Sequence, residues 1–293
     1  MIDRTYLEPT NLEQARSMLA ANHGLRIVAG GTDLVVAARS GKAPLPERLI
    51  AIHRLKELAG IRTEAGRGLR IGALTTHADL EISEVVHDAW SALSDASALV
   101  GSPATRHVGT VGGNICNASP AMELGSPLLV FDATIELASI KGVRSVPFSS
   151  FVTGPGRTSA HSGELLIAVV VPPLAGRCGS AYMRLEYRLA MEIAIVGAAA
   201  MVRIDDLDRC IDAKVALTAV APTCVRATEA EEILRGKALD SELLKRAAGA
   251  AAASARPIDD VRASADYRSA MVPVIVRRAL TRAFDRAQQR RLS

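Results

Sequence analysis

Residues 110–121 read TVGGNICNASPA, and residues 28–34 read VAGGTDL. Each segment places two adjacent glycines beside a threonine and a second polar residue, after an apolar strand or a loop. A glycine pair permits positive φ angles and lets backbone N–H groups approach a ligand, because no Cβ stands in the way. Successive N–H groups of this kind form a concave anion site. From the residues alone two interpretations are open: tight turns at strand ends, or a cradle for a phosphate-bearing cofactor.

Neither segment matches the common nucleotide-binding fingerprints. The chain contains no GxxxxGK[ST] sequence and no GxGxxG sequence after an expected strand. An ATP-type P-loop is therefore excluded, and a Rossmann site is not expected.

The composition is that of an ordinary globular protein. Of 293 residues, 49% are hydrophobic and 23% are charged, with a formal net charge of +4. This length suits two or three domains. The basic residues are spread along the chain and aromatic residues make up only 3%, whereas a nucleic-acid surface usually needs a basic patch. We therefore expect no nucleic-acid partner.

The cysteines and histidines give no metal signature. There is no CxxC pair and no HxH or HExxH motif, so neither a zinc site nor an iron–sulfur cluster is expected in this chain. No apolar run approaches the about 20 residues of a membrane span, and the N-terminus shows no signal peptide. We expect a protein of the reducing cytoplasm without a disulfide framework.

The hydrophobic pattern predicts three units, each with strands and helices. In the first unit, a helix from Leu12 to about Asn22 precedes strands at 25–29 and 49–52. In the second, Pro172 and Pro173 mark the clearest boundary. Its expected strands are 60–62, 69–73, 133–140 and 164–171, its helices 77–99 and 123–131, and its long loop 101–114. In the third, strands at 193–204 and 212–221 precede helices at 226–235, 240–255 and 266–290. Strands followed by helices predict an α+β fold rather than a doubly wound sheet.

Several local features have a specific expectation. A helix should run from the first glycine pair to about Arg39, with Thr32 or Asp33 as its N-cap; Asp33 is equally suited to contact a cofactor. Pro273 lies inside the last helical pattern and should kink or restart it.

Three residues near the second glycine pair have two interpretations each. His107 is a flavin-modulating residue or a loop histidine, and Arg106 meets a phosphate or a neighbouring carboxylate. Cys116 is a redox thiol or a small buried residue.

The chain resembles the FAD-binding subunits of the xanthine dehydrogenase and carbon monoxide dehydrogenase family, which are the medium subunits of molybdenum hydroxylases. The resemblance extends over nearly the whole chain, and TVGGNICNASPA is its most specific part. Its segments are 29–34 (AGGTDL), 110–121, 188–194 (RLAMEIA) and 266–268 (DYR). It implies a two-subdomain FAD-binding fold of the PCMH/VAO type, in residues 1–54 and 55–174. A C-terminal α+β domain, an antiparallel sheet with helices, would follow in residues 175–293.

The resemblance also implies which residues bind non-covalent FAD. The first glycine segment would wrap the pyrophosphate from one side, and the second would close on it from the other. Val100 and Leu166 lie where the family has apolar contacts, and Arg184 lies where some relatives have a lysine near the flavin. The expected cofactor residues are Ala29, Gly30, Gly31, Thr32, Asp33, Leu34, Val100, Thr110, Val111, Gly112, Gly113, Asn114, Glu123, Leu166 and Arg184. No catalytic residue and no metal ligand is expected.

Three positions depart from the family pattern. Glu123 and Glu192 stand where relatives often have aspartate, and Pro273 stands where they have glycine or another non-proline residue. Glu123 corresponds to a side chain that contacts the cofactor, so its extra methylene changes the reach of the carboxylate.

The implied function is electron transfer within an oxidoreductase complex. A molybdopterin subunit would oxidise the substrate, and a small subunit would relay the electrons through [2Fe–2S] clusters. The FAD of this chain would pass them to an external acceptor such as NAD or a quinone. Two alternatives stay open: a stand-alone FAD-dependent oxidase or reductase of the same fold, and a flavin-free scaffold subunit. The intact glycine pairs argue against the scaffold.

Overall fold

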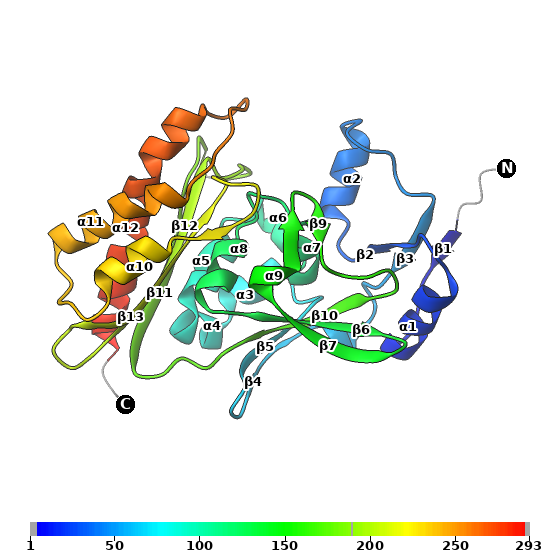
Figure 1. The fold of residues 1–293 in the computed structure, drawn as a ribbon. Helices are drawn as coiled ribbons and strands as arrows, with labels where there is room; N and C mark the ends of the chain where they lie inside the picture. Colours follow the sequence, from blue (N-terminus) through cyan, green and yellow to red (C-terminus); the bar gives the residue numbers. More distant parts are fainter. Residues whose placement is uncertain (1–4, 189, 291–293) are drawn as a thin grey trace.

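The computed structural model describes residues 5–188 and 190–290, which form an elongated α+β molecule (Figure 1). The expectations for the N-terminal end, residues 1–4, and for Leu189 of the RLAMEIA segment lie outside these residues. The α+β class is confirmed, because each of the three larger sheets is accompanied by helices.

The N-terminal part is a parallel sheet with two helices. Strands β1 (Thr5–Leu7), β2 (Arg26–Val28) and β3 (Arg48–Ala51) pair in the order β1-β3-β2. Helix α1 (Leu12–Ala21) begins at Asn11, whose side chain accepts a hydrogen bond from the backbone of Gln14, and it buries Ala15 and Leu19. Helix α2 (Thr32–Arg39) buries none of its residues and rises from the end of β2 in Figure 1.

The middle part is a five-stranded antiparallel sheet in the order β4-β5-β10-β6-β7. Its strands are β4 (Ile61–Glu64), β5 (Gly68–Gly72), β6 (Thr134–Ser139), β7 (Gly142–Pro147) and β10 (Leu165–Val171), and a small hairpin is formed by β8 (Val152–Gly154) and β9 (Arg157–Thr158). The central strand β10 is buried along its whole length, which matches its unbroken apolar sequence.

Short helices cover this sheet. They are η1 (Lys56–Leu58), α3 (His77–Ile82), α4 (Glu84–Ala89), α5 (Ser91–Ala98), α6 (Pro103–Arg106), α7 (Val111–Asn117), α8 (Gly125–Val130) and α9 (Phe148–Phe151). The single helix expected over 77–99 is therefore wrong. Ser83 ends α3 and its side chain caps α4 by accepting from the Val86 N–H group, and Trp90 ends α4. Caps of this kind stop a helix even where the hydrophobic pattern continues.

The expected long loop over 101–114 is also wrong. Ser102 caps α6 and Thr110 caps α7, the latter by accepting from the backbone of Gly113 at 3.1 Å. The second glycine pair thus lies in the first turn of a helix. Glycine is a poor helix former, and here the threonine cap and the close packing of Gly112 on Ala73 outweigh that preference.

The C-terminal part is an antiparallel sheet with helices on one face (Figure 1). Its elements are β11 (Arg177–Leu185), β12 (Val196–Ile204), β13 (Cys210–Thr218), β14 (Val225–Arg226), α10 (Thr228–Leu234), α11 (Ser241–Ala251), η2 (Ala252–Ser254) and α12 (Ala265–Gln289). Helix α12 lies against β11 so closely that a Cβ on Gly179 would overlap the carbonyl oxygen of Ala283. The helix runs through Pro273 without restarting, because Val272, Ile275 and Val276 are fully buried against the sheet and compensate for the missing N–H bond.

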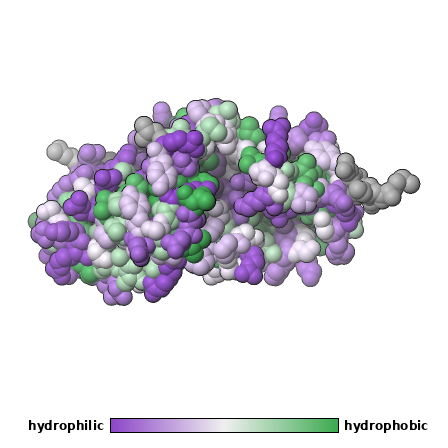
Figure 2. Space-filling model, turned by 90° about the horizontal axis from the view of Figure 1, so that it is seen from above, coloured by the Kyte–Doolittle hydropathy of each residue, from purple (hydrophilic) through white to green (hydrophobic). Residues whose placement is uncertain are grey.

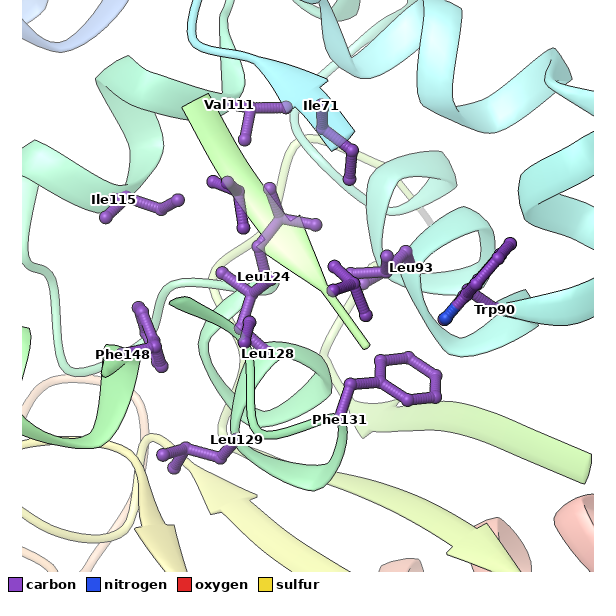
Figure 3. Packing of buried hydrophobic residues seen from close by; sticks show 14 of the residues in the cluster. Ile71, Trp90, Leu93, Val111, Ile115, Leu124, Leu128, Leu129, Phe131 and Phe148 are labelled. Atoms are coloured by element: carbon purple, nitrogen blue, oxygen red, sulfur yellow. The ribbon is translucent and has the colours of Figure 1, made fainter. Parts of the chain in front are cut away.

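One large core joins the middle and C-terminal parts. Side chains of β5, α5, α7 and α8 converge in it (Figure 3), and Tyr182, Ala199 and Met201 of the C-terminal sheet belong to the same cluster. Asp95 of α5 adds a polar link. It accepts from Arg286 of α12 at 2.6 and 2.9 Å and from the Tyr182 N–H group at 3.1 Å. A smaller cluster joins the N-terminal part to the middle sheet, because it contains Ala15, Leu19 and Ile50 together with Ala138, Leu165 and Ile167.

Candidate functional site

The fold brings the two glycine segments into direct contact. A Cβ on Gly30 would overlap the carbonyl oxygen of Val108 and lie 2.7 Å from its carbonyl carbon and 3.3 Å from the Gly109 nitrogen. A Cβ on Gly109 would lie 3.7 Å from Oγ1 of Thr32. Residue 30 therefore has to be glycine for the backbones to approach this closely, and segments far apart in the sequence form one site.

The first segment ends in an open helix N-terminus. Gly31 is the N-cap of α2, with φ of +70°, and no side chain caps the helix. The expectation that Thr32 or Asp33 is the cap is wrong, because the left-handed Gly31 makes Thr32 the first helical residue. The first N–H groups of a helix have no partner within it, and its N-terminus carries a partial positive charge. Such an end is suited to bind an anion.

The second segment uses its N–H groups differently. Val111 and Gly112 donate to the carbonyl oxygens of Thr75 and Ala73 at 2.9 and 2.8 Å, and Gly113 donates to Oγ1 of Thr110. The hypothesis that both glycine pairs present free N–H groups is therefore wrong for Val111, Gly112 and Gly113. Gly112 instead permits close packing, since a Cβ there would lie 2.9 Å from Cβ of Ala73.

Two polar side chains around the second segment lack partners. Oδ1 of Asn114 and Nδ1 of His77 are buried without a hydrogen bond in the described part of the chain. Burial, together with the guanidinium of Arg106, lowers the pKa of His77 to about 4, so its imidazole is neutral at physiological pH. His77 could not be predicted from the sequence, because it reaches Gly109 only through a bridge between residues 76 and 110.

A buried acid–base cluster connects the middle part with β11. Nη1 of Arg184 lies 2.7 Å from Oε1 of Glu123, and Nε of Arg184 donates to Glu186. The Arg184 side chain is 1% exposed, and its Nη2 has no hydrogen-bond partner among the described residues. Burial raises the pKa of Glu123 to about 7, although Arg184 acts against it. Asp33 adds to this rise, so the first glycine segment lies within electrostatic range of Glu123.

Leu166 and Val100 are the residues expected to make apolar contacts with the cofactor. Leu166 is a core residue of β10, 4% exposed. Val100 is half-buried and precedes Gly101, whose carbonyl accepts from the Met191 N–H group at 3.2 Å. That contact ties the RLAMEIA segment to the same region. Within the segment, Glu192 pairs with Arg188 at 3.0 Å.

The structure decides between the two interpretations of Arg106 and Cys116 and shows the surroundings of His107. Arg106 pairs with Glu81 at 2.6 Å, which is the carboxylate interpretation. His107 is exposed, and its ring bonds to the Pro103 carbonyl. Cys116 is exposed on α7, so the expectation of a buried residue is wrong. Desolvation by the neighbouring protein atoms raises the pKa of the thiol to about 12, although Arg26 of β2 acts in the opposite direction.

Seen from above, the surface is hollowed between the two halves of the molecule, with hydrophobic patches on both sides (Figure 2). Within residues 5–188 and 190–290, no group of three or more His, Cys, Asp or Glu residues is arranged to hold a metal ion. No helix in the same residues has the length and apolar character needed to cross a membrane.

Comparison with known families assigns both halves of the chain. Residues 2–174 match the FAD binding domain in molybdopterin dehydrogenase, and residues 180–283 match the CO dehydrogenase flavoprotein C-terminal domain.

Individual relatives agree with these matches over nearly the full length. The xanthine dehydrogenase FAD-binding subunit of Escherichia coli O157:H7 is 31% identical, with 95% of each chain covered. The carbon monoxide dehydrogenase medium chain of Hydrogenophaga pseudoflava is 34% identical, with 96% of this chain and 97% of the relative covered. A solved structure of carbon monoxide dehydrogenase from that organism, lacking the Mo-pyranopterin moiety, has a TM-score of 0.90 at 34% identity, with 96% and 97% covered. The chain therefore belongs to the family of FAD-binding subunits of molybdenum-dependent oxidoreductases that includes xanthine dehydrogenase and carbon monoxide dehydrogenase.

Proposed function

We propose that this chain is the FAD-carrying electron-transfer subunit of a molybdenum hydroxylase complex. It takes electrons from a [2Fe–2S] cluster of a small partner subunit, while a large molybdopterin subunit oxidises the substrate. It passes the electrons to an external acceptor such as NAD or a quinone. FAD supplies the chemistry of this step, since flavins accept electrons singly and release them in pairs. The observation that carries the proposal is the contact of Gly30 with Val108, which joins two glycine segments at the uncapped end of α2.

The polar groups of the site fit FAD. The pyrophosphate is an anion, and the N-terminus of α2 offers unpartnered N–H groups and a positive dipole end. Asn114 and Arg184 each keep a buried polar atom without a partner in the described residues, and such atoms normally have one. The proposed cofactor residues are those expected from the family: Ala29, Gly30, Gly31, Thr32, Asp33, Leu34, Val100, Thr110, Val111, Gly112, Gly113, Asn114, Glu123, Leu166 and Arg184.

The proposed division of labour follows the three units. Residues 1–54 and 55–174 hold FAD between them, and residues 175–293 dock against the partner subunits. The cysteines found free are Cys116, Cys178, Cys210 and Cys224. Free thiols are typical of a reducing compartment, which supports the cytoplasm as the place of action.

Absorption spectroscopy of the purified chain tests the cofactor. We expect flavin bands, and heat denaturation should release FAD into the supernatant because the attachment is non-covalent. A colourless chain that also fails to bind added FAD would contradict the proposal.

Electron transfer is tested with the assembled complex. Substrate should reduce the flavin only when the molybdopterin and iron–sulfur subunits are both present. If the isolated chain oxidises a substrate and reduces an acceptor unaided, the alternative of a stand-alone oxidase or reductase is correct instead.

Thiol labelling offers a second test, which locates the cofactor. Cys116 is exposed on α7, and Arg26 of the first unit is close enough for its charge to act on the thiol. FAD held between α7 and the first unit should therefore cover Cys116. We expect a maleimide to modify Cys116 before the buried Cys178 and Cys210, and saturating FAD to slow this reaction about tenfold or more. With a pKa near 12, the rate without FAD should rise about tenfold per pH unit above neutrality, because the thiolate is the reactive form.

Peptide mass spectrometry identifies the modified cysteine. A Cys116→Ser chain serves as the control and should lose the FAD-sensitive label. Equal labelling rates with and without FAD would show that the cofactor does not lie over α7.

A further inference from the structure

Glu123 lies in a cluster in which acids outnumber bases. It shares the single guanidinium of Arg184 with Glu186, and the side chains of Glu123 and Glu186 are only 11% and 13% exposed. Asp33 contributes a third negative charge from the first glycine segment. Tyr182 and Cys224 also face Glu123, but burial raises the pKa of Tyr182 well above its usual value and that of Cys224 to about 12, so both are neutral at physiological pH. With all three acids ionised, the cluster has an uncompensated negative charge in a poorly solvated place.

A second buried glutamate shows the opposite balance. The Glu136 side chain is 10% exposed, but it bonds to two arginines, Arg67 at 2.7 Å and Arg70 at 2.9 Å. Burial favours its neutral form, yet the hydrogen bonds and charges of the two arginines outweigh burial and lower its pKa. Burial alone therefore does not decide which form a carboxyl group takes in this protein. Glu136 has two arginine partners, whereas Glu123 shares one arginine with Glu186, and opposite charges nearby favour the ionised carboxylate.

We infer that FAD binding is coupled to the uptake of a proton by the carboxyl group of Glu123, so that the affinity for FAD falls as the pH rises above neutrality. The inference rests on the proposed function and adds a regulatory property to that site. Two effects act in the same direction. The cofactor displaces water from the space between Asp33 and Glu123, which disfavours the charged carboxylate, and its pyrophosphate brings further negative charge. Protonation leaves Arg184 to Glu186 and turns Glu123 into a hydrogen-bond donor.

The direction of the pH dependence follows from linkage. In the free chain the pKa of Glu123 is about 7, and in the bound chain it is higher. Below both values the group is protonated in both states, and no proton is exchanged. Between them, binding takes up a proton, and each pH unit weakens binding by up to about tenfold. Burial also raises the pKa of Asp33, so an Asp33→Asn variant is needed to separate its contribution from that of Glu123.

Titration calorimetry of the full-length apo chain with FAD tests the inference. At about pH 8, in two buffers of different ionisation enthalpy, the difference in heat should correspond to about 0.5–1 proton taken up per FAD. The dissociation constant should rise by about three- to fivefold from pH 7 to pH 8. Glu123→Gln should abolish both effects, because the amide cannot take up a proton. Glu136→Gln, a matched change at a buried carboxyl group of β6 that bonds to Arg67 and Arg70, should leave them unchanged.

Each outcome has a distinct meaning. Absence of proton uptake in the unmodified chain that binds FAD would overturn the inference and leave the proposed function intact, and so would an equal uptake in Glu123→Gln. If Glu123→Gln does not fold, the comparison of Asp33→Asn with the unmodified chain still tests the inference. Proton uptake that disappears in Asp33→Asn would show that Asp33, and not Glu123, takes up the proton, and would overturn the inference. A chain that binds no FAD under any condition would overturn the proposed function itself.

Discussion

Replacement of Gly30 by alanine is expected to weaken FAD binding by about 10- to 100-fold, the result of an overpacking penalty of about 1–3 kcal/mol. The added Cβ would overlap the carbonyl oxygen of Val108 and press on its carbonyl carbon at 2.7 Å. Both atoms belong to the backbone, so no side-chain rotation relieves the contact. The two glycine segments must move apart, which widens the site on which the pyrophosphate is proposed to lie. Fluorescence titration of the apo chain with FAD gives the dissociation constant.

The control for this substitution is Gly249→Ala in α11. No atom lies within 4 Å of the Cβ that this change adds, and the residue is helical. It should leave FAD affinity unchanged and stabilise the chain slightly, because alanine is the better helix former. An unaltered FAD affinity in Gly30→Ala would mean that the contact between the segments does not shape the cofactor site.

Replacement of Arg268 by methionine is expected to lower the free energy of unfolding by about 3–5 kcal/mol, as is typical when one partner of a buried polar cluster is removed. The Arg268 side chain is 4% exposed. Its Nη1 donates to the carbonyl oxygens of Ile195 and Ala219 at 2.8 and 2.9 Å, and its Nη2 donates to Asp260 at 2.7 Å. Methionine fills a similar volume but leaves these oxygens without their donor. Chemical denaturation followed by circular dichroism measures the change.

The same substitution at an exposed arginine of the same helix separates this effect from a general loss of charge. Arg278→Met in α12 should change the free energy of unfolding by no more than about 0.5 kcal/mol. A similar loss in both variants would argue against the buried cluster as the cause.

Local patterns in the sequence were sufficient for elements that carry their own caps or an unbroken apolar run. Asn11 caps α1 as its position before Leu12 suggests, and the apolar residues 165–171 form the buried strand β10. Strand β11, however, was not predicted. Its residues Gly179, Ser180 and Ala181 are not strand formers, and it forms because it pairs with β12 and packs against α12.

The candidate site divides in the same way. The family resemblance indicated Glu123 and Arg184 as cofactor residues. The glycine segments and the resemblance could not indicate that Glu186 also bonds to the guanidinium of Arg184. Nor could they indicate that the N–H groups of Val111 and Gly112 already donate to the carbonyl oxygens of Thr75 and Ala73, respectively. Glu123 and Arg184, like the two backbone pairs, are far apart in the sequence, and a single sequence contains no periodicity that reports such contacts. Arg184 and Glu186 are two residues apart in the sequence, but their contact depends on burial of the arginine beside Glu123.

The unequal cores imply an uneven energy landscape. Because Tyr182, Ala199 and Met201 belong to the cluster that also contains Leu69 and Ile71, the middle and C-terminal parts should open together as one foldon with the highest resistance to hydrogen exchange. The N-terminal part packs through a smaller cluster on Ala138, Leu165 and Ile167 of the middle sheet, and its Gly30 lies against the backbone of Val108. Because this cluster is the smaller one, we expect the N-terminal part to separate from the middle sheet at a lower free energy than global unfolding. FAD should then be able to leave and rebind while the larger foldon stays folded.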